Sequence, residues 1–173
     1  MYRWQVIRYI VYGAEIVFAF LLQSTPHALP ELFGVKAVVL VPLSLSFAVY
    51  ERETAAMATG AVCGWLADGS YSGSMSFYGL VLVISGFLVS SGFRYYFRRN
   101  RLTVILLSLA AIPLILSLEF LFGYLLKGYP DGGYVFVRHY IPRMVYTLAF
   151  TPVCCAVNRR SVRLFVSRES RFV

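Results

Sequence analysis

Six apolar stretches of helical length, separated by short polar or charged segments, run along the chain. They cover about residues 6–22, 32–50, 54–68, 76–93, 102–126 and 140–157. A helix needs roughly 20 apolar residues to cross a hydrocarbon core of about 30 Å, and the third stretch is short for this purpose. The pattern therefore predicts one domain over residues 1–173, an all-α integral membrane protein built as a single bundle of six transmembrane helices with a short third helix.

Glycine and proline set the expected boundaries of these helices. Pro42 is expected to kink the second helix, and Pro142 to interrupt the start of the sixth. Residues 127–139 contain several glycines and a proline and are expected to form the longest loop. The arginine-rich tail, residues 158–173, is expected to lie on the membrane surface or to fray.

Composition and charge agree with a membrane protein and suggest its orientation. Only 14% of the 173 residues are charged and the mean hydropathy is +0.70, whereas a soluble domain carries about a quarter charged residues. In a six-span topology, 12 of the 16 basic residues fall on the side of the two termini, which the positive-inside rule places in the cytoplasm. The net charge of +8 is then explained by anionic lipids at the cytoplasmic face, and no nucleic-acid partner is expected.

Four residues of the third stretch recur at intervals of four: Ala56, Gly60, Gly64 and Asp68. At 3.6 residues per turn they share one helix face, and the three small residues allow another helix backbone to approach closely. Asp68 ends this face, and a turn containing Gly73 follows before the next apolar stretch. We therefore expect this stripe to serve helix packing or partner docking.

Charged residues inside the predicted spans are the candidates for function, since such groups are costly in lipid and face the bundle interior or a partner. In the predicted topology Asp68, Glu119 and Arg143 lie at similar depth on the outer side, so that a carboxylate can pair with Arg143. Two interpretations stay open, a binding pocket open to the outside and an interhelical polar clasp, of which the clasp is favoured. Glu15 lies nearer the middle of the membrane, where it is neutral or pairs with another helix or subunit.

The sequence shows no pattern typical of a catalytic, metal or cofactor site. The three cysteines and two histidines lack metal-ligand spacing, and no nucleophile stands with a base in a recognisable motif. We therefore expect a protein that is not an enzyme and holds no metal or cofactor.

The polar landmarks, taken in order, resemble those of the bacterial rod-shape-determining MreD family over nearly the whole length. The shared features are a glutamate in the first helix (Glu15), the run Gly64-Trp-Leu-Ala-Asp68 followed by Ser72-Gly73 and Tyr78-Gly79, then Leu118-Glu119-Phe120 with Gly123, and Ile141-Pro142 after Arg138 and His139. Arg143 directly after the proline and the arginine-rich tail depart from the family pattern.

The resemblance implies a membrane scaffold subunit of the cell-elongation machinery in the bacterial cytoplasmic membrane. Such a subunit binds an MreC-like scaffold protein and supports the peptidoglycan synthase complex, with its transglycosylase and transpeptidase, that builds the lateral wall. The family is also similar in fold to the substrate-binding S-components of energy-coupling-factor vitamin transporters. An S-component that binds a vitamin-like ligand through Asp68, Glu119 and Arg143 is therefore the alternative, although the first helix lacks the Ala-x-x-x-Ala type of docking motif.

Overall fold

The computed structural model describes residues 2–25, 35–70, 77–96, 101–125, 128 and 132–169, and this part of the chain is predominantly helical. Its elements are α1 (Tyr2–Ser24), α2 (Leu40–Tyr50), α3 (Glu53–Ser70), α4 (Phe77–Tyr95), α5 (Arg101–Phe120), the π-helix η1 (Leu121–Leu125), α6 (Gly132–Val135), the π-helix η2 (Phe136–Tyr140) and α7 (Ile141–Glu169). The all-helical part of the prediction is confirmed for the described residues.

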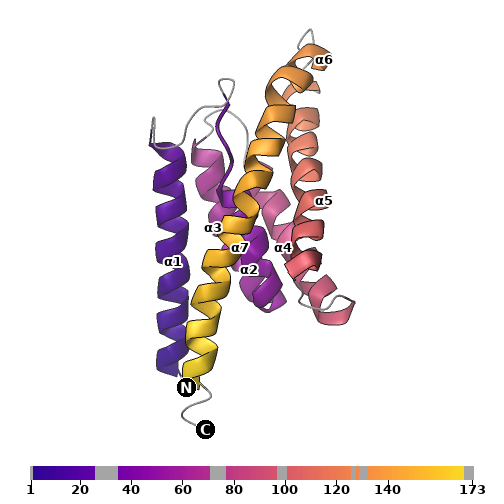
Figure 1. Cartoon of the computed structure of the whole chain (residues 1–173). Coiled ribbons are helices and arrows are strands. Elements are labelled where there is room, and N and C mark those ends of the chain that lie inside the picture. Colours follow the sequence, from indigo (N-terminus) through magenta and orange to yellow (C-terminus); the bar gives the residue numbers. More distant parts are fainter. Residues whose placement is uncertain are drawn as a thin grey trace.

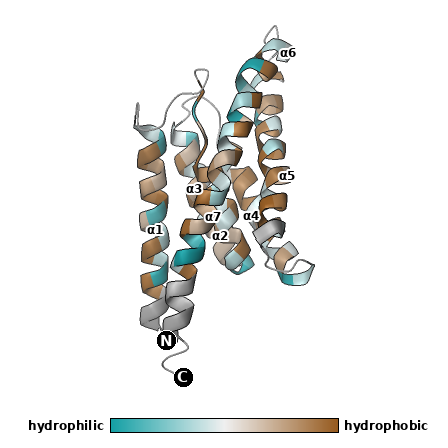
Figure 2. Ribbon diagram, viewed as in Figure 1, coloured by the Kyte–Doolittle hydropathy of each residue, from teal (hydrophilic) through white to brown (hydrophobic). Residues whose placement is uncertain are grey.

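Four helical segments are long and apolar enough to cross a membrane, judged by length and composition. They are Val6–Ser24, Phe77–Tyr95, Thr103–Leu125 and Gly132–Val162. Their outward surfaces carry large apolar side chains, such as Phe18 and Leu106, each at least two-thirds exposed. Figure 2 shows apolar residues along most of α1 and α5. Continuous apolar surface of this extent is unusual on a soluble monomer and fits a lipid environment.

The other long helices surround α2, which forms the centre of the bundle. In the described part of the chain α2 contacts α1, α3, α4, α5 and α7. Each of these five also contacts the next in that order, and α7 contacts α1, so that they form a ring around α2. Figure 1 shows the bundle from the side. Residues 40–49 of α2 are all buried, as expected for a helix that is apolar all round. The start of α1 and the end of α7 lie at the same end of the bundle (Figure 1).

The predicted helix 32–50 is wrong in its first part. Residues 35–39 precede the helix, which begins at Leu40, and residues 32–34 lie outside the described part of the chain. Pro42 falls in the first turn of α2, where a proline costs no intrahelical hydrogen bond, so it starts the helix rather than kinking it. Side chains of other helices accept the backbone N–H groups of this buried entry: Val38 donates to Thr147 Oγ1 at 3.2 Å and Leu40 to Gln23 Oε1 at 3.4 Å.

The predicted loop 127–139 is wrong from residue 132 onward, whereas Gly128 lies in a turn as expected. The predicted fraying of the tail is wrong as far as Glu169, and its position on the membrane surface stays a prediction. Residues 132–139 belong to α6 and η2, which lead directly into α7, and α7 continues to Glu169. Pro142 does not interrupt the helix, because the wider π turn of η2 directly precedes it at the position where the proline ring would otherwise clash with the preceding turn.

Candidate functional site

The small-residue stripe on α3 is buried against α4. Ala56, Gly60 and Gly64 are all buried. A Cβ atom added to Gly64 would lie 2.5 Å from the Cα of Gly79, and one added to Gly60 would lie 2.6 Å from the carbonyl oxygen of Leu82. The two backbones therefore meet directly, which is the close approach that this spacing favours in lipid. This face packs helices within the chain and is not open to a separate partner.

Asp68, at the end of the stripe, binds the start of α4. Its Oδ1 accepts a hydrogen bond from the backbone N–H of Tyr78 at 3.0 Å, and its Oδ2 accepts one from Gly79 at 2.9 Å. The first N–H groups of a helix have no intrahelical acceptors, and a carboxylate at this position also interacts favourably with the helix dipole. Asp68 thus caps the next helix across the turn.

Tyr78, Glu119 and Arg143 join α4, α5 and α7 in a cluster that we call the Tyr78 clasp. Arg143 Nη1 donates to Glu119 Oε1 at 3.1 Å, and its Nη2 donates to the Tyr78 hydroxyl at 3.2 Å. The Tyr78 hydroxyl in turn donates to Glu119 Oε2. The side chains of Arg143 and Glu119 are only 11% and 14% exposed, so the charge-assisted bonds lie in surroundings that strengthen them.

The sequence predicts that Asp68, Glu119 and Arg143 lie at similar depth in the bundle. In the structure they are connected through Tyr78. The backbone of Tyr78 is bound by Asp68 and its hydroxyl by the other two. Each of the four carboxylate oxygens accepts a hydrogen bond from within the chain. The arrangement holds four helices, α3, α4, α5 and α7, in a fixed relation.

Aromatic rings pack the end of α5 against η2, beside the Tyr78 clasp. The ring of Phe120 lies 5.0 Å from those of both Phe136 and Tyr140, measured between centroids. The π-helix η1 begins two residues after Glu119, and η2 ends three residues before Arg143. The π-helices η1 and η2 and the ring contacts beside them therefore help to position the ion pair between Glu119 and Arg143.

A second polar cluster, not expected from the sequence, lies at the end of the bundle where α1 starts. Tyr12 donates to Glu51 Oε1 at 2.8 Å, while Arg8 forms an ion pair with Glu51 and donates to the Tyr12 hydroxyl at 3.2 Å. Ser90 donates to the carbonyl oxygen of Glu51 at 2.8 Å. The signal available in the sequence was the four-residue spacing of Arg8 and Tyr12, which places both on one face of α1.

The remaining candidates fall in different places. Ser161 of α7 donates a hydrogen bond to Glu15 Oε1, which joins α7 to α1. Pro142 lies in the first turn of α7 beside Arg143. Gly73 lies outside the described residues.

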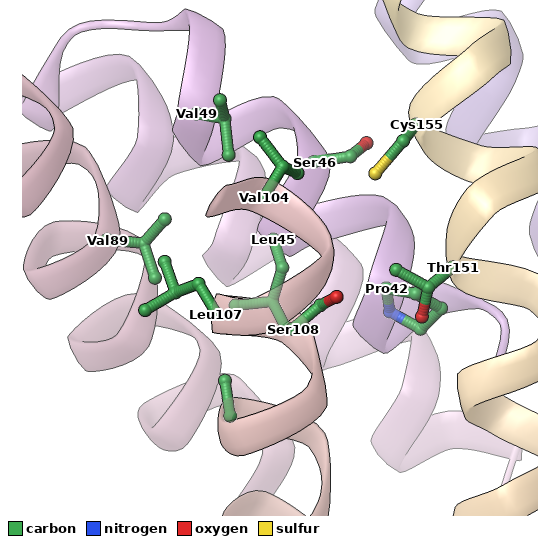
Figure 3. A pocket seen from close by; sticks show the side chains of 11 residues that line it. Pro42, Leu45, Ser46, Val49, Val89, Val104, Leu107, Ser108, Thr151 and Cys155 are labelled. Atoms are coloured by element: carbon green, nitrogen blue, oxygen red, sulfur yellow. The ribbon is translucent and has the colours of Figure 1, made fainter. Parts of the chain in front are cut away.

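The bundle interior offers little room for a ligand where α2, α4, α5 and α7 meet. The hollow there is lined by apolar side chains with Ser46, Ser108 and Thr151 (Figure 3), and its volume is about 10 Å³, enough for about one water molecule. Within the described ranges, no group of three histidine, cysteine or acidic residues could hold a metal ion.

The chain matches no protein-family model, no curated protein and no solved structure. Its polar clusters and the order of its sequence motifs are the observations that bear on function.

Proposed function

We propose that this chain is a non-enzymatic scaffold subunit of the bacterial cell-elongation machinery, similar to MreD proteins. It would lie in the cytoplasmic membrane with both termini in the cytoplasm. There it would bind an MreC-like membrane protein and, through it, support the transglycosylase and transpeptidase of lateral wall synthesis.

The observation that supports this proposal most is the way in which the motif residues come together. Gly64 and Asp68, the two ends of the run Gly64-Trp-Leu-Ala-Asp68, contact Tyr78 and Gly79, and Tyr78 contacts Glu119 of the run Leu118-Glu119-Phe120. The residues that carry the resemblance are far apart in the sequence and thus form one continuous chain of contacts. Because the polar groups of this cluster bond to one another and join helices, the cluster fits a rigid scaffold.

The alternative, a vitamin-binding transporter component, receives less support from the same geometry. Its expected ligand contacts were Asp68, Glu119 and Arg143. The oxygens of both carboxylates already accept hydrogen bonds within the chain, so a ligand would have to displace these bonds. The scaffold function is therefore favoured over the transporter function, and the experiment below distinguishes the two.

Purification of the tagged chain from its native membrane in mild detergent, with mass spectrometry of the proteins that accompany it, tests the proposal. A scaffold subunit should recover an MreC-like protein together with cell-wall synthases. An unrelated polytopic protein with the same tag is the control and should recover neither. Recovery of ATPase subunits with a coupling membrane protein would overturn the scaffold proposal in favour of the transporter.

A further inference from the structure

A crevice opens between α1 and the α2–α3 connection, at the end of the bundle where α1 starts. It has a volume of about 470 Å³ and is lined by Arg8, Tyr9, Tyr50, Glu51, Arg52, Thr54 and Ala55. This volume falls in the range of small-molecule sites, roughly 300–1,000 Å³. Nothing in the proposed scaffold function assigns a role to this feature, which we call the connector crevice.

The charges that line the connector crevice favour an anion over a cation. Glu51 is the only acidic residue among the described residues of the lining, its side chain is 5% exposed, and its Oε1 already binds Arg8 and Tyr12. The Arg8 side chain stays 27% exposed, and Arg52 is exposed and makes no ion pair with any described residue. Among the described residues of the lining, an ammonium group therefore finds no exposed carboxylate. An anionic group finds the exposed guanidinium of Arg52 and the part of the Arg8 guanidinium that is not bound to Tyr12 and Glu51.

The position of the connector crevice along the bundle points to a lipid as the source of that anion. Val6 begins the apolar stretch of α1, so Arg8 and Tyr9 stand within its first turn, at the level expected for the membrane surface. Val6 and Ile10 are 53% and 64% exposed, and with Tyr9 they share one face of the helix. A headgroup in the crevice would thus have apolar surface beside it for acyl chains, and an exposed tyrosine of the kind found at membrane interfaces.

We propose that the connector crevice binds the phosphate group of an anionic phospholipid, held by Arg52 and Arg8. Basic pockets between transmembrane helices are a recognised way of binding such headgroups. The first turn of α3 contributes Thr54 and Ala55 to the lining, and its backbone N–H groups lack intrahelical acceptors. The acidic residue of the same turn, Glu53, is not part of the described lining and pairs with Arg94. This site requires that the apolar helices lie in a membrane, but it does not depend on the identity of the protein partner proposed above.

Native mass spectrometry of the full chain in detergent, titrated with phosphatidylglycerol, tests the site. The matched variants are Arg52→Gln and Arg138→Gln. Arg138 is exposed, lies in η2 directly after α6, and bonds only to Tyr134 among the described residues. Figure 1 shows α6 at the end of the bundle opposite to the start of α1. Each variant removes one positive charge. Phosphatidylcholine with the same acyl chains and free glycerol phosphate are the comparison probes.

Wild type and Arg138→Gln should retain phosphatidylglycerol with equal apparent affinity, and Arg52→Gln should bind it about fivefold more weakly. The proposal is overturned if Arg52→Gln binds phosphatidylglycerol as wild type does, or if phosphatidylcholine binds as tightly. Displacement by equimolar glycerol phosphate would show that the crevice takes a soluble phosphate ester, which overturns the lipid as its ligand. Because Arg52 is exposed, an unchanged elution profile in size-exclusion chromatography is expected for its variant and excludes unfolding as the cause.

Discussion

Two glycines that face each other between α3 and α4, Gly64 and Gly79, should differ in how much a substitution by alanine changes the stability of the protein. A Cβ on Gly64 would lie 2.5 Å from both the Cα of Gly79 and the carbonyl oxygen of Tyr78, and these backbone atoms cannot rotate away. A Cβ on Gly79 would meet its nearest neighbour, Asp68 Oδ2, at 3.5 Å, an ordinary van der Waals distance. We therefore expect Gly64→Ala to destabilise the protein and Gly79→Ala to leave it unharmed.

The expected magnitude follows from the distances. An ordinary Cβ contact needs at least 3.4 Å, so α3 and α4 would have to separate by about 1 Å at Gly64. Overpacking costs about 1–3 kcal/mol, and the upper part of this range, about 2–3 kcal/mol, applies here because both close atoms belong to the backbone. The better helix propensity of alanine offsets about 0.5–1 kcal/mol. A net loss of about 1–2.5 kcal/mol corresponds to a melting temperature lowered by about 2–10 °C in a chain of this size. Gly79→Ala should raise it slightly or not at all.

The buried free thiols of Cys63 and Cys154 provide the assay. A maleimide dye that fluoresces on reaction reports their exposure as the detergent-solubilised protein is heated. Gly13→Ala serves as a second control, because a Cβ there would have no neighbour within 4 Å. Our account of the α3–α4 contact is refuted if Gly64→Ala melts with the wild type, or if Gly79→Ala falls as far as Gly64→Ala.

The same assay tests three further contacts. Arg143→Met should cost about 3 kcal/mol because it leaves the carboxylate of Glu119 partly buried without its cation; the double variant with Glu119→Gln should lose less than the sum of the single losses, and strict additivity would contradict a coupled pair. Asp68→Ala should cost about 0.5–2 kcal/mol through the lost cap of α4, with Asp68→Asn closer to wild type. Tyr12→Phe should cost about 1–2 kcal/mol by removing the donor to a buried carboxylate, while the exposed Tyr9→Phe stays neutral, and equal losses in the two would argue against this contact.

The sequence predicted helices best where the chain itself marks their ends. The stretches 54–68 and 76–93 became Glu53–Ser70 and Phe77–Tyr95, because charged connectors and a glycine-rich turn separate them. The start of α2 could not be predicted in this way, since residues 35–39 are as apolar as the helix that follows. What keeps them out of a helix is tertiary: side chains from α1 and α7 accept the backbone N–H groups of the entry to α2.

The candidate site was predictable in its residue types but not in its connections. The spacing of the stripe indicates its helical face, and the cost of charge in lipid suggests that Arg143 pairs with a carboxylate. The partners of Asp68 are backbone N–H groups, which carry no sequence signal, and Tyr78 is one of many tyrosines in the chain. Glu51 lies between two predicted helices, and its burial could not be predicted because it depends on α1 folding beside it.

Depletion of this chain in its native host tests the scaffold function most directly. Fluorescent D-amino-acid labelling can report wall synthesis along the sides of the cells, and microscopy their width and length. The account predicts that lateral incorporation declines, that the cells widen and round as the chain is lost, and that re-expression restores both. Cells that keep their shape and their lateral labelling after complete depletion would contradict it.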